Sequence, residues 1–145
     1  MSDDSFTSAF IAESIEILRG LSVEEVDAAI ALLAQTRRRG GRVFFCGSGG
    51  GAGHASHATC DFRKLAGFEA YCVSDNVSEL TARVNDDGWD SSYANWLAGS
   101  RINDKDCLLG CIHRPLQVCL RVIWRFCEKR AYALKRSSKP FLGFR

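Results

Sequence analysis

One stretch of the chain decides the fold class: Gly41-Arg-Val-Phe-Phe-Cys-Gly-Ser-Gly-Gly-Gly-Ala-Gly-His-Ala-Ser-His57. Residues 42–46 form a short apolar run bounded by glycine, which predicts a buried parallel strand. A glycine-rich turn follows, and residues 52–65 have a helical pattern. A strand, such a turn and a helix bring several backbone amides and a positive helix terminus to one point, which favours a phosphate site. Glycine suits this turn because an anion close to the backbone leaves no room for side chains.

The segments on either side of this stretch predict alternating helices and strands. A capping box, Ser22 with Glu25, marks the start of the second helix, and Gly40-Gly41 stops it. Aromatic residues on one face of the helix after Gly88 favour a place in the core or a subunit interface. Such alternation predicts a parallel sheet flanked by helices. The expected elements are helices over residues 6–18, 23–39, 52–65 and 89–97, strands over 42–46, 68–74 and from 106 to 109, and turns at 74–78 and 85–88.

The net charge of +2 conceals two unlike regions. Residues 1–110 hold 10 basic and 16 acidic side chains, a net of −6, whereas residues 111–145 hold 9 basic side chains and one acid, a net of +8. We therefore predict a domain over residues 1–109 and a basic tail over 110–145. Within the tail, residues 116–136 have the pattern of an amphipathic helix, for which the simpler interpretation is an apolar face on the sheet and a solvated basic face.

Cysteine usage and the amino terminus bear on the compartment. The seven cysteines form no Cys-x-x-Cys pair, and several lie in apolar runs, which favours buried free thiols over a disulfide framework. The acidic start is unlike a secretory signal, and no apolar run is long enough to cross a bilayer. We expect a cytoplasmic protein with no membrane span, and we do not expect nucleic-acid binding.

The glycine-rich turn also fits a nucleotide-binding motif. Gly47-x-Gly49-x-x-Ala52 matches the dinucleotide fingerprint, but Asp75 lies 28 residues after Gly47, later than the acid that such a site uses. A Rossmann-type nucleotide binder therefore stays open as an alternative.

Two motifs in the right order resemble the sugar isomerase (SIS) family, in its phosphoheptose isomerase branch. They are the quoted stretch from Gly41 to His57 and the run Ser74-Asp-Asn-Val-Ser-Glu-Leu-Thr-Ala-Arg-Val-Asn-Asp-Asp-Gly-Trp89, and the likeness covers about residues 1–109. It implies a flavodoxin-like three-layer α/β sandwich with a parallel sheet, assembled as a homo-oligomer, a dimer or tetramer. It also implies aldose–ketose isomerisation of sedoheptulose 7-phosphate through an enediol, with zinc at the site.

The resemblance also implies roles for single residues. His57 falls where the family has a metal-binding histidine, and Asp61 falls where it has a glutamate that acts as base and metal ligand. Residues i and i+4 share one helical face and can reach one ion, although an exposed solvated pair is the simpler structural interpretation. The predicted substrate- and phosphate-binding residues are Gly47, Ser48, Gly49, Gly50, Gly51 and Asp75; Ser48 replaces an asparagine of the family and Gly51 a serine.

Beyond Leu109 the family pattern is not found. A second Ser/Gly-rich loop and a later helix with Gln and His, which complete the family's phosphate and metal sites, have no counterpart in residues 110–145. Either these residues are a frame-shifted or rearranged gene end, or they are a selected feature. The function hypotheses are a phosphoheptose isomerase-like sugar-phosphate protein and, alternatively, a non-catalytic SIS module that binds sugar phosphate or a protein partner.

Overall fold

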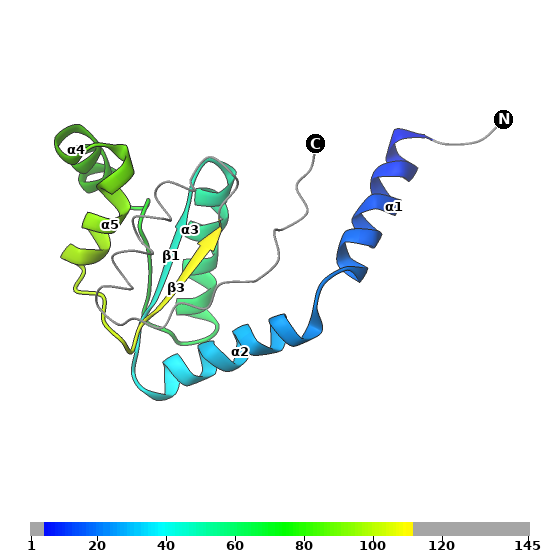
Figure 1. Cartoon of the computed structure of the whole chain (residues 1–145), viewed down its shortest axis with the longest axis horizontal. Coiled ribbons are helices and arrows are strands. Elements are labelled where there is room, and N and C mark those ends of the chain that lie inside the picture. Colours follow the sequence, from blue (N-terminus) through cyan, green and yellow to red (C-terminus); the bar gives the residue numbers. More distant parts are fainter. Residues whose placement is uncertain (1–4, 112–145) are drawn as a thin grey trace. The chain divides into compact units, whose positions relative to one another are not determined.

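The computed structural model describes residues 5–111 of the 145-residue chain. The predicted helix over residues 116–136, and almost all of the predicted basic tail, lie outside the described residues. The chain divides into two compact units, one up to Leu32 and one from Leu33 onward, and each is treated by itself. Figure 1 gives the order of the helices and strands.

The first unit contains α1, Phe6–Arg19, and the beginning of α2, Val23–Arg38. Ser5 caps α1, because its hydroxyl accepts from the Ser8 amide at 3.2 Å, and the helix ends at Gly20 as predicted. The predicted capping box of α2 is half formed. The Glu25 amide donates to Ser22 Oγ at 3.2 Å, and the Ser22 hydroxyl itself donates to Glu24 Oε2 at 2.9 Å.

The second unit is built on a three-stranded parallel sheet in the order β2-β1-β3. Its strands are β1, Val43–Gly47; β2, Ala70–Cys72; and β3, Cys107–Cys111. All five residues of β1 are buried, which fits a central strand that is covered on both faces. The predicted parallel sheet is confirmed, with β2 shorter than the expected run.

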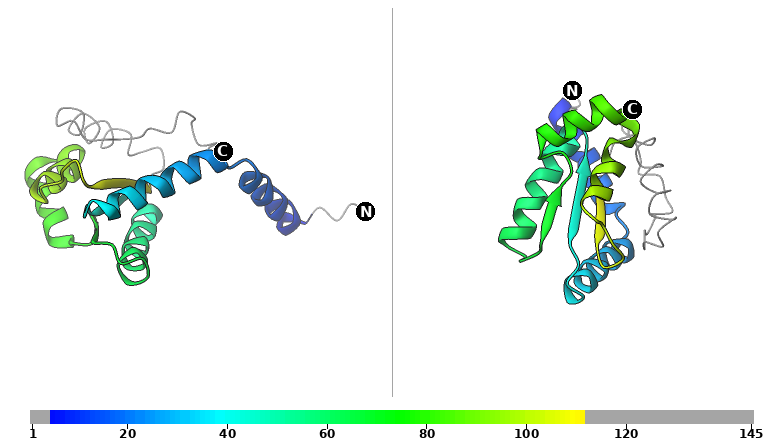
Figure 2. Two further views of the ribbon diagram at one scale, coloured as in Figure 1. Left: turned by 90° about the horizontal axis from the view of Figure 1, so that it is seen from below. Right: turned by 90° about the vertical axis from the view of Figure 1, so that its left-hand side faces the viewer.

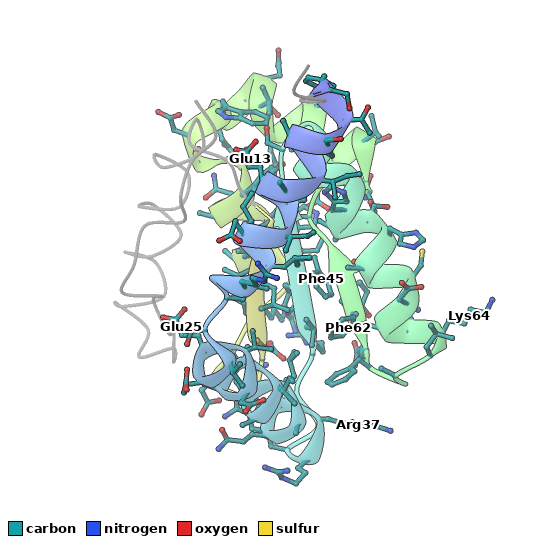
Figure 3. The ribbon with its side chains drawn as sticks, turned by 90° about the vertical axis from the view of Figure 1, so that its right-hand side faces the viewer. Glu13, Glu25, Arg37, Phe45, Phe62 and Lys64 are labelled. Atoms are coloured by element: carbon teal, nitrogen blue, oxygen red, sulfur yellow. The ribbon has the colours of Figure 1, made fainter. Side chains whose placement is uncertain are left out.

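Helices cover both faces of this sheet. Phe45 of β1 meets Phe62 of α3, Gly50–Lys64, with ring centroids 5.0 Å apart, and Figure 3 shows the two rings side by side. Phe44, the preceding residue, meets Trp96 of α5, Trp89–Gly99, at 6.0 Å. Because successive side chains of a strand point to opposite faces, α3 and α5 lie on opposite faces of the sheet, as Figure 2 also shows. The α/β sandwich is therefore present.

The core lies between the sheet and α5. It consists of buried residues from β1, from α5 and from the segments directly after β2 and α5: Phe44, Cys46, Val73, Tyr93, Ala94, Trp96, Leu97 and Ile102. The aromatic face of α5 was expected in the core or in an interface, and Tyr93 and Trp96 do lie in the core. Trp89 is 43% exposed.

None of the helices within residues 5–111 has the length and apolar character that a bilayer crossing requires.

Two predicted turns are partly wrong, because residues 77–78 of the first and 85–87 of the second lie in a helix. Residues 85–87 were expected to form a turn, but they belong to α4, Val77–Asp87, which ends only at Gly88, where φ is +81°. Asn76 caps this helix by accepting from the Glu79 amide at 3.1 Å, and Arg83 bonds Glu79 Oε1 at 2.7 Å. These local bonds stabilise α4, so the helix continues through the short polar side chains of residues 85–87. It ends at Gly88 because glycine adopts the positive φ that stops a helix.

Candidate functional site

The predicted binding residues lie at or just after the carboxyl ends of two neighbouring strands. β1 ends at Gly47 and its parallel neighbour β2 ends at Cys72, so both ends lie at the same edge of the sheet. The glycine-rich turn follows the first end and Asp75 follows the second. In open parallel sheets, ligands bind at this edge, in the region between neighbouring strand ends. The structure thus brings Asp75 to the same edge as the glycine loop, which we define as residues 47–53.

Two glycines of this loop are required by its backbone. A Cβ on Gly47 would overlap the Gly51 carbonyl and would lie 2.7 Å from the Ala52 nitrogen, so the end of β1 and the first turn of α3 touch without side chains between them. Gly49 has φ +53° and ψ −125°, a conformation that a side chain disfavours. The sequence therefore encodes a tight strand-to-helix turn at this point.

The outer side of the loop is open. A Cβ on Gly49, Gly50 or Gly53 would meet nothing within 4 Å, and Ser48 is exposed. Gly49 is the N-cap of α3 and provides no side-chain hydrogen bond to the helix. The amides of Gly51 and Ala52 donate back to Ser48 and Gly49 carbonyls at 2.9 and 3.0 Å, whereas Gly50, the first helical residue, has no intrahelical acceptor by position. An open helix start of this kind attracts an anion.

His57 and Asp61 lie together on the solvent-facing side of α3. The His57 Nε2 and Asp61 Oδ2 atoms are 3.5 Å apart, and their side chains are 81% and 50% exposed. The predicted spacing on one face is therefore present. Imidazole nitrogen and carboxylate oxygen are both zinc ligands, but a structural or catalytic zinc site uses three or four protein ligands. Within residues 5–111 no group of three or more His, Cys, Asp or Glu side chains is placed to hold a metal ion.

The pair and the loop are well separated along α3. Asp61 lies eleven residues beyond Gly50, which corresponds to about three turns or 16 Å of helix. A single substrate must span this distance if the loop binds its phosphate and Asp61 acts on its carbon atoms. His54, which has no counterpart in the family pattern, is also exposed on α3.

Asp75 projects from an exposed turn after β2. Its amide donates to the Cys72 carbonyl at 3.3 Å, and the Cys72 Sγ and Ser74 Oγ atoms are 3.2 Å apart. Burial is the main cause that raises the pKa of the Cys72 thiol, which therefore stays neutral beside the site. The Asp75 side chain is left exposed at the edge where the glycine loop begins.

One residue at the loop escaped the sequence analysis as a site residue. The hydroxyl of Tyr93, on α5, donates to the Gly47 carbonyl at 2.6 Å, and Tyr93 is 2% exposed. In the sequence it is one of several aromatics on an apolar face. Its hydroxyl group could have indicated a role beyond packing, since a buried tyrosine hydroxyl usually has a hydrogen-bond partner.

Comparisons with known proteins agree with this geometry. The chain is 33% identical over 102 residues to the phosphoheptose isomerase of Roseiflexus sp. (strain RS-1), which covers 63% of this chain and 52% of that protein. It is 29% identical over 117 residues to the phosphoheptose isomerase of Helicobacter pylori (strain P12), covering 76% and 60%. The structure of the phosphoheptose isomerase GmhA from Neisseria gonorrhoeae matches with a TM-score of 0.75 at 25% identity, over 87% of this chain and 69% of that one. The chain is therefore similar to part of the phosphoheptose isomerases, and it shares the fold of GmhA.

The likeness covers only part of each relative. The chain spans about half of the length of the curated relatives, 52% and 60% in the two cases above. No protein-family model matches the chain. The SIS fold that the sequence motifs predicted is therefore confirmed for the described residues, with a sheet of three parallel strands.

Proposed function

We propose that this chain binds a sugar phosphate of the heptose 7-phosphate class and acts as a phosphoheptose isomerase-like protein. The observation that carries the proposal is the open glycine loop at the start of α3, at the sheet edge where ligands bind. The phosphoheptose isomerases that the chain resembles support the choice of ligand. Gly47, Ser48, Gly49, Gly50 and Gly51 receive the phosphate, and Asp75 faces the sugar from the neighbouring strand end.

For catalysis we propose that Asp61 is the base. Isomerisation of an aldose to a ketose moves one proton between C1 and C2 through an enediol, and a carboxylate can take the proton from one carbon and return it to the other. The Asp61 side chain is half exposed, which leaves it accessible to a substrate, and His57 lies beside it.

We propose that His57 and Asp61 are the two ligands that this chain offers to zinc. The pair supplies two donors of suitable chemistry, but the described residues supply no third, so they do not complete a zinc site.

The first test of the proposed function is an isomerase assay with sedoheptulose 7-phosphate and added zinc. Asp61→Asn removes the base and should abolish turnover, while sugar-phosphate binding, measured by calorimetry, should persist. Asp104→Asn is the matched control, because Asp104 is an exposed acid in the turn before β3, away from the loop edge. If the wild-type chain binds the sugar phosphate without turnover, the chain is a non-catalytic binding module. If it does not bind the sugar phosphate, the proposal is rejected.

We also propose that the chain assembles with further copies of itself through the first unit. No residue of α1 is buried, and large apolar side chains in residues 5–32 are exposed, which is unusual for a water-facing surface. They are Phe6, Phe10, Ile11, Ile15, Ile17, Leu18, Leu21, Val23, Val26 and Ile30. A second copy of the same helices offers an equivalent apolar surface, as symmetric interfaces require.

Finally, we propose a cytoplasmic location. Cys46, Cys60, Cys72 and Cys107 are free thiols, and three of them are buried. Such thiols suit a reducing compartment. Fractionation of cells that express the tagged chain tests this directly, with recovery in an oxidising compartment as the contrary result.

A further inference from the structure

The glycine loop is held from two sides. On one side, Gly47 lies so close to Gly51 and Ala52 that no side chain fits between β1 and α3. On the other side, the Tyr93 hydroxyl donates to the Gly47 carbonyl at 2.6 Å, across 46 residues of sequence. The bond is buried and joins α5 to the last residue of the central strand.

This bond fixes the direction of one peptide unit. A peptide unit is planar, and in its trans form the C=O and N–H groups point in opposite directions. The Gly47 carbonyl and the Ser48 N–H belong to the same unit. With its carbonyl directed toward Tyr93, the unit directs the Ser48 N–H in the opposite direction, away from Tyr93. The Ser48 amide is the first amide beyond β1, next to the exposed residues Gly49 and Gly50.

The surroundings of Tyr93 make it a firm anchor. Its ring lies in the core with Phe44, Trp96 and Leu97, and it contacts the Trp89 ring with centroids 5.7 Å apart. Close packing leaves a buried ring few alternative positions. Ser48, Gly49 and Gly50, in contrast, are exposed, so Tyr93 is the buried anchor on this side of the loop.

We propose that Tyr93 is a positioning residue of the anion loop, whose hydroxyl orients the Gly47–Ser48 peptide for phosphate binding. This rests on the proposed function, in which the loop receives the phosphate. Tyr93 does not touch the ligand; it acts through the Gly47 carbonyl.

The test uses the full chain and two matched variants. Tyr93→Phe removes only the hydroxyl and keeps the ring. Ser92→Ala also removes a buried hydroxyl from α5, but that hydroxyl donates to the Trp89 carbonyl at 2.8 Å within the same helix. Hydrogen exchange of the Ser48, Gly49 and Gly50 amides is measured by NMR, and the same amides report titrations with inorganic phosphate and sedoheptulose 7-phosphate.

In Tyr93→Phe we expect loop-amide exchange to be about tenfold faster and both ligands to bind about tenfold more weakly, as for the loss of one buried hydrogen bond. Ser92→Ala should leave the loop and the affinities unchanged. Exchange at the loop amides is compared with exchange at the β1 amides. A general loss of stability would speed exchange at both places, so it can be told apart from a change in the loop alone.

Loop exchange in Tyr93→Phe equal to that in Ser92→Ala overturns the proposal, and so does faster exchange with unchanged affinity. If the wild-type chain binds neither ligand, the proposed function fails, and with it the role of Tyr93 in binding. The exchange data then still show whether Tyr93 orients the loop, so the two failures are distinguishable.

Discussion

The carboxylate of Asp106 is held by Arg42 at the opposite edge of the sheet from the glycine loop. Arg42 Nη2 lies 2.8 Å from Asp106 Oδ2, the Arg42 amide donates to Oδ1 at 2.8 Å, and the Asp106 side chain is 1% exposed. Arg42 also donates to the Ser100 and Arg101 carbonyls at 3.1 and 3.0 Å. The hydrogen bond to Asp106 is the main cause that raises the pKa of Arg42. The pair therefore joins the segment between α5 and β3 to the start of β1.

Removal of Asp106 should destabilise the second unit. Asp106→Ala leaves the partly buried Arg42 without its counter-ion, and we expect a loss of about 3 kcal/mol of unfolding free energy. Urea unfolding followed by tryptophan fluorescence measures the change. Asp104→Ala, at an exposed position two residues earlier, should stay within about 0.5 kcal/mol of wild type. Equal effects of the two substitutions would contradict a special role for the buried pair.

Substitutions at two glycines of the loop should affect stability and phosphate binding separately. Gly47→Ala forces a Cβ against the Gly51 carbonyl and should cost about 1–3 kcal/mol of stability, as overpacking does. Gly50→Ala meets no atom within 4 Å, so it should keep the wild-type stability. Because its methyl group would occupy open space at the first residue of α3, where we propose that the phosphate binds, Gly50→Ala should weaken phosphate binding. Unfolding curves and phosphate titrations of both variants check the two statements, and a stable Gly47→Ala protein would refute the first.

Zinc affinity should depend on the His57–Asp61 pair. His57→Ala removes one of two neighbouring donors, and we expect zinc binding, measured by competition with a chromophoric chelator, to weaken at least about tenfold. His54→Ala is the matched control on the same helix and should change the affinity little. If His54→Ala has the larger effect, the metal is held elsewhere on α3.

The buried thiols should make the protein less stable at alkaline pH. Burial raises the pKa of Cys72 and Cys107 above the ordinary value of 9.0. A group whose pKa is higher in the folded state binds its proton more tightly there, so its contribution is complete below the unfolded-state pKa and is lost as pH rises through the folded-state pKa. We therefore expect unfolding free energy to fall above about pH 9.

Alkylation gives a second readout of the same thiols. At pH 8, iodoacetamide should modify the exposed Cys60 well before Cys72 and Cys107, because a raised pKa and burial both reduce the accessible thiolate. Peptide mass spectrometry of each cysteine follows the time course. Rapid labelling of Cys72 in the native protein would show that the thiol is not protected.

Assembly should fail when α1 receives a charge on its apolar face. Phe10→Asp places a carboxylate among exposed apolar side chains, and we expect a smaller particle by size-exclusion chromatography with light scattering. Ala12→Asp adds the same charge near Glu16 and Arg19 on the other side of the helix and should leave the size unchanged. A wild-type chain that is monomeric at micromolar concentration would contradict the proposed assembly.

Much of the fold could be predicted from local pattern. Glycine marks the end of α1 and of α4, and the apolar run before the glycine loop became the buried strand β1. The local signal failed at residues 85–87, where short polar side chains are typical of turns but continue α4. The position of Gly88 was the better signal, because its positive φ is what ends the helix.

The sequence alone determined the strand–glycine–helix unit and the His57–Asp61 spacing, because both follow from the periods of strand and helix over a few neighbouring residues. Only the tertiary structure decided that Tyr93 bonds Gly47 and that Asp106 bonds Arg42. These partners lie 46 and 64 residues apart, and periodicity carries no information about such pairs. They meet because the parallel sheet and α5 close around one core, which places the loop and its anchor at one edge and the ion pair at the other.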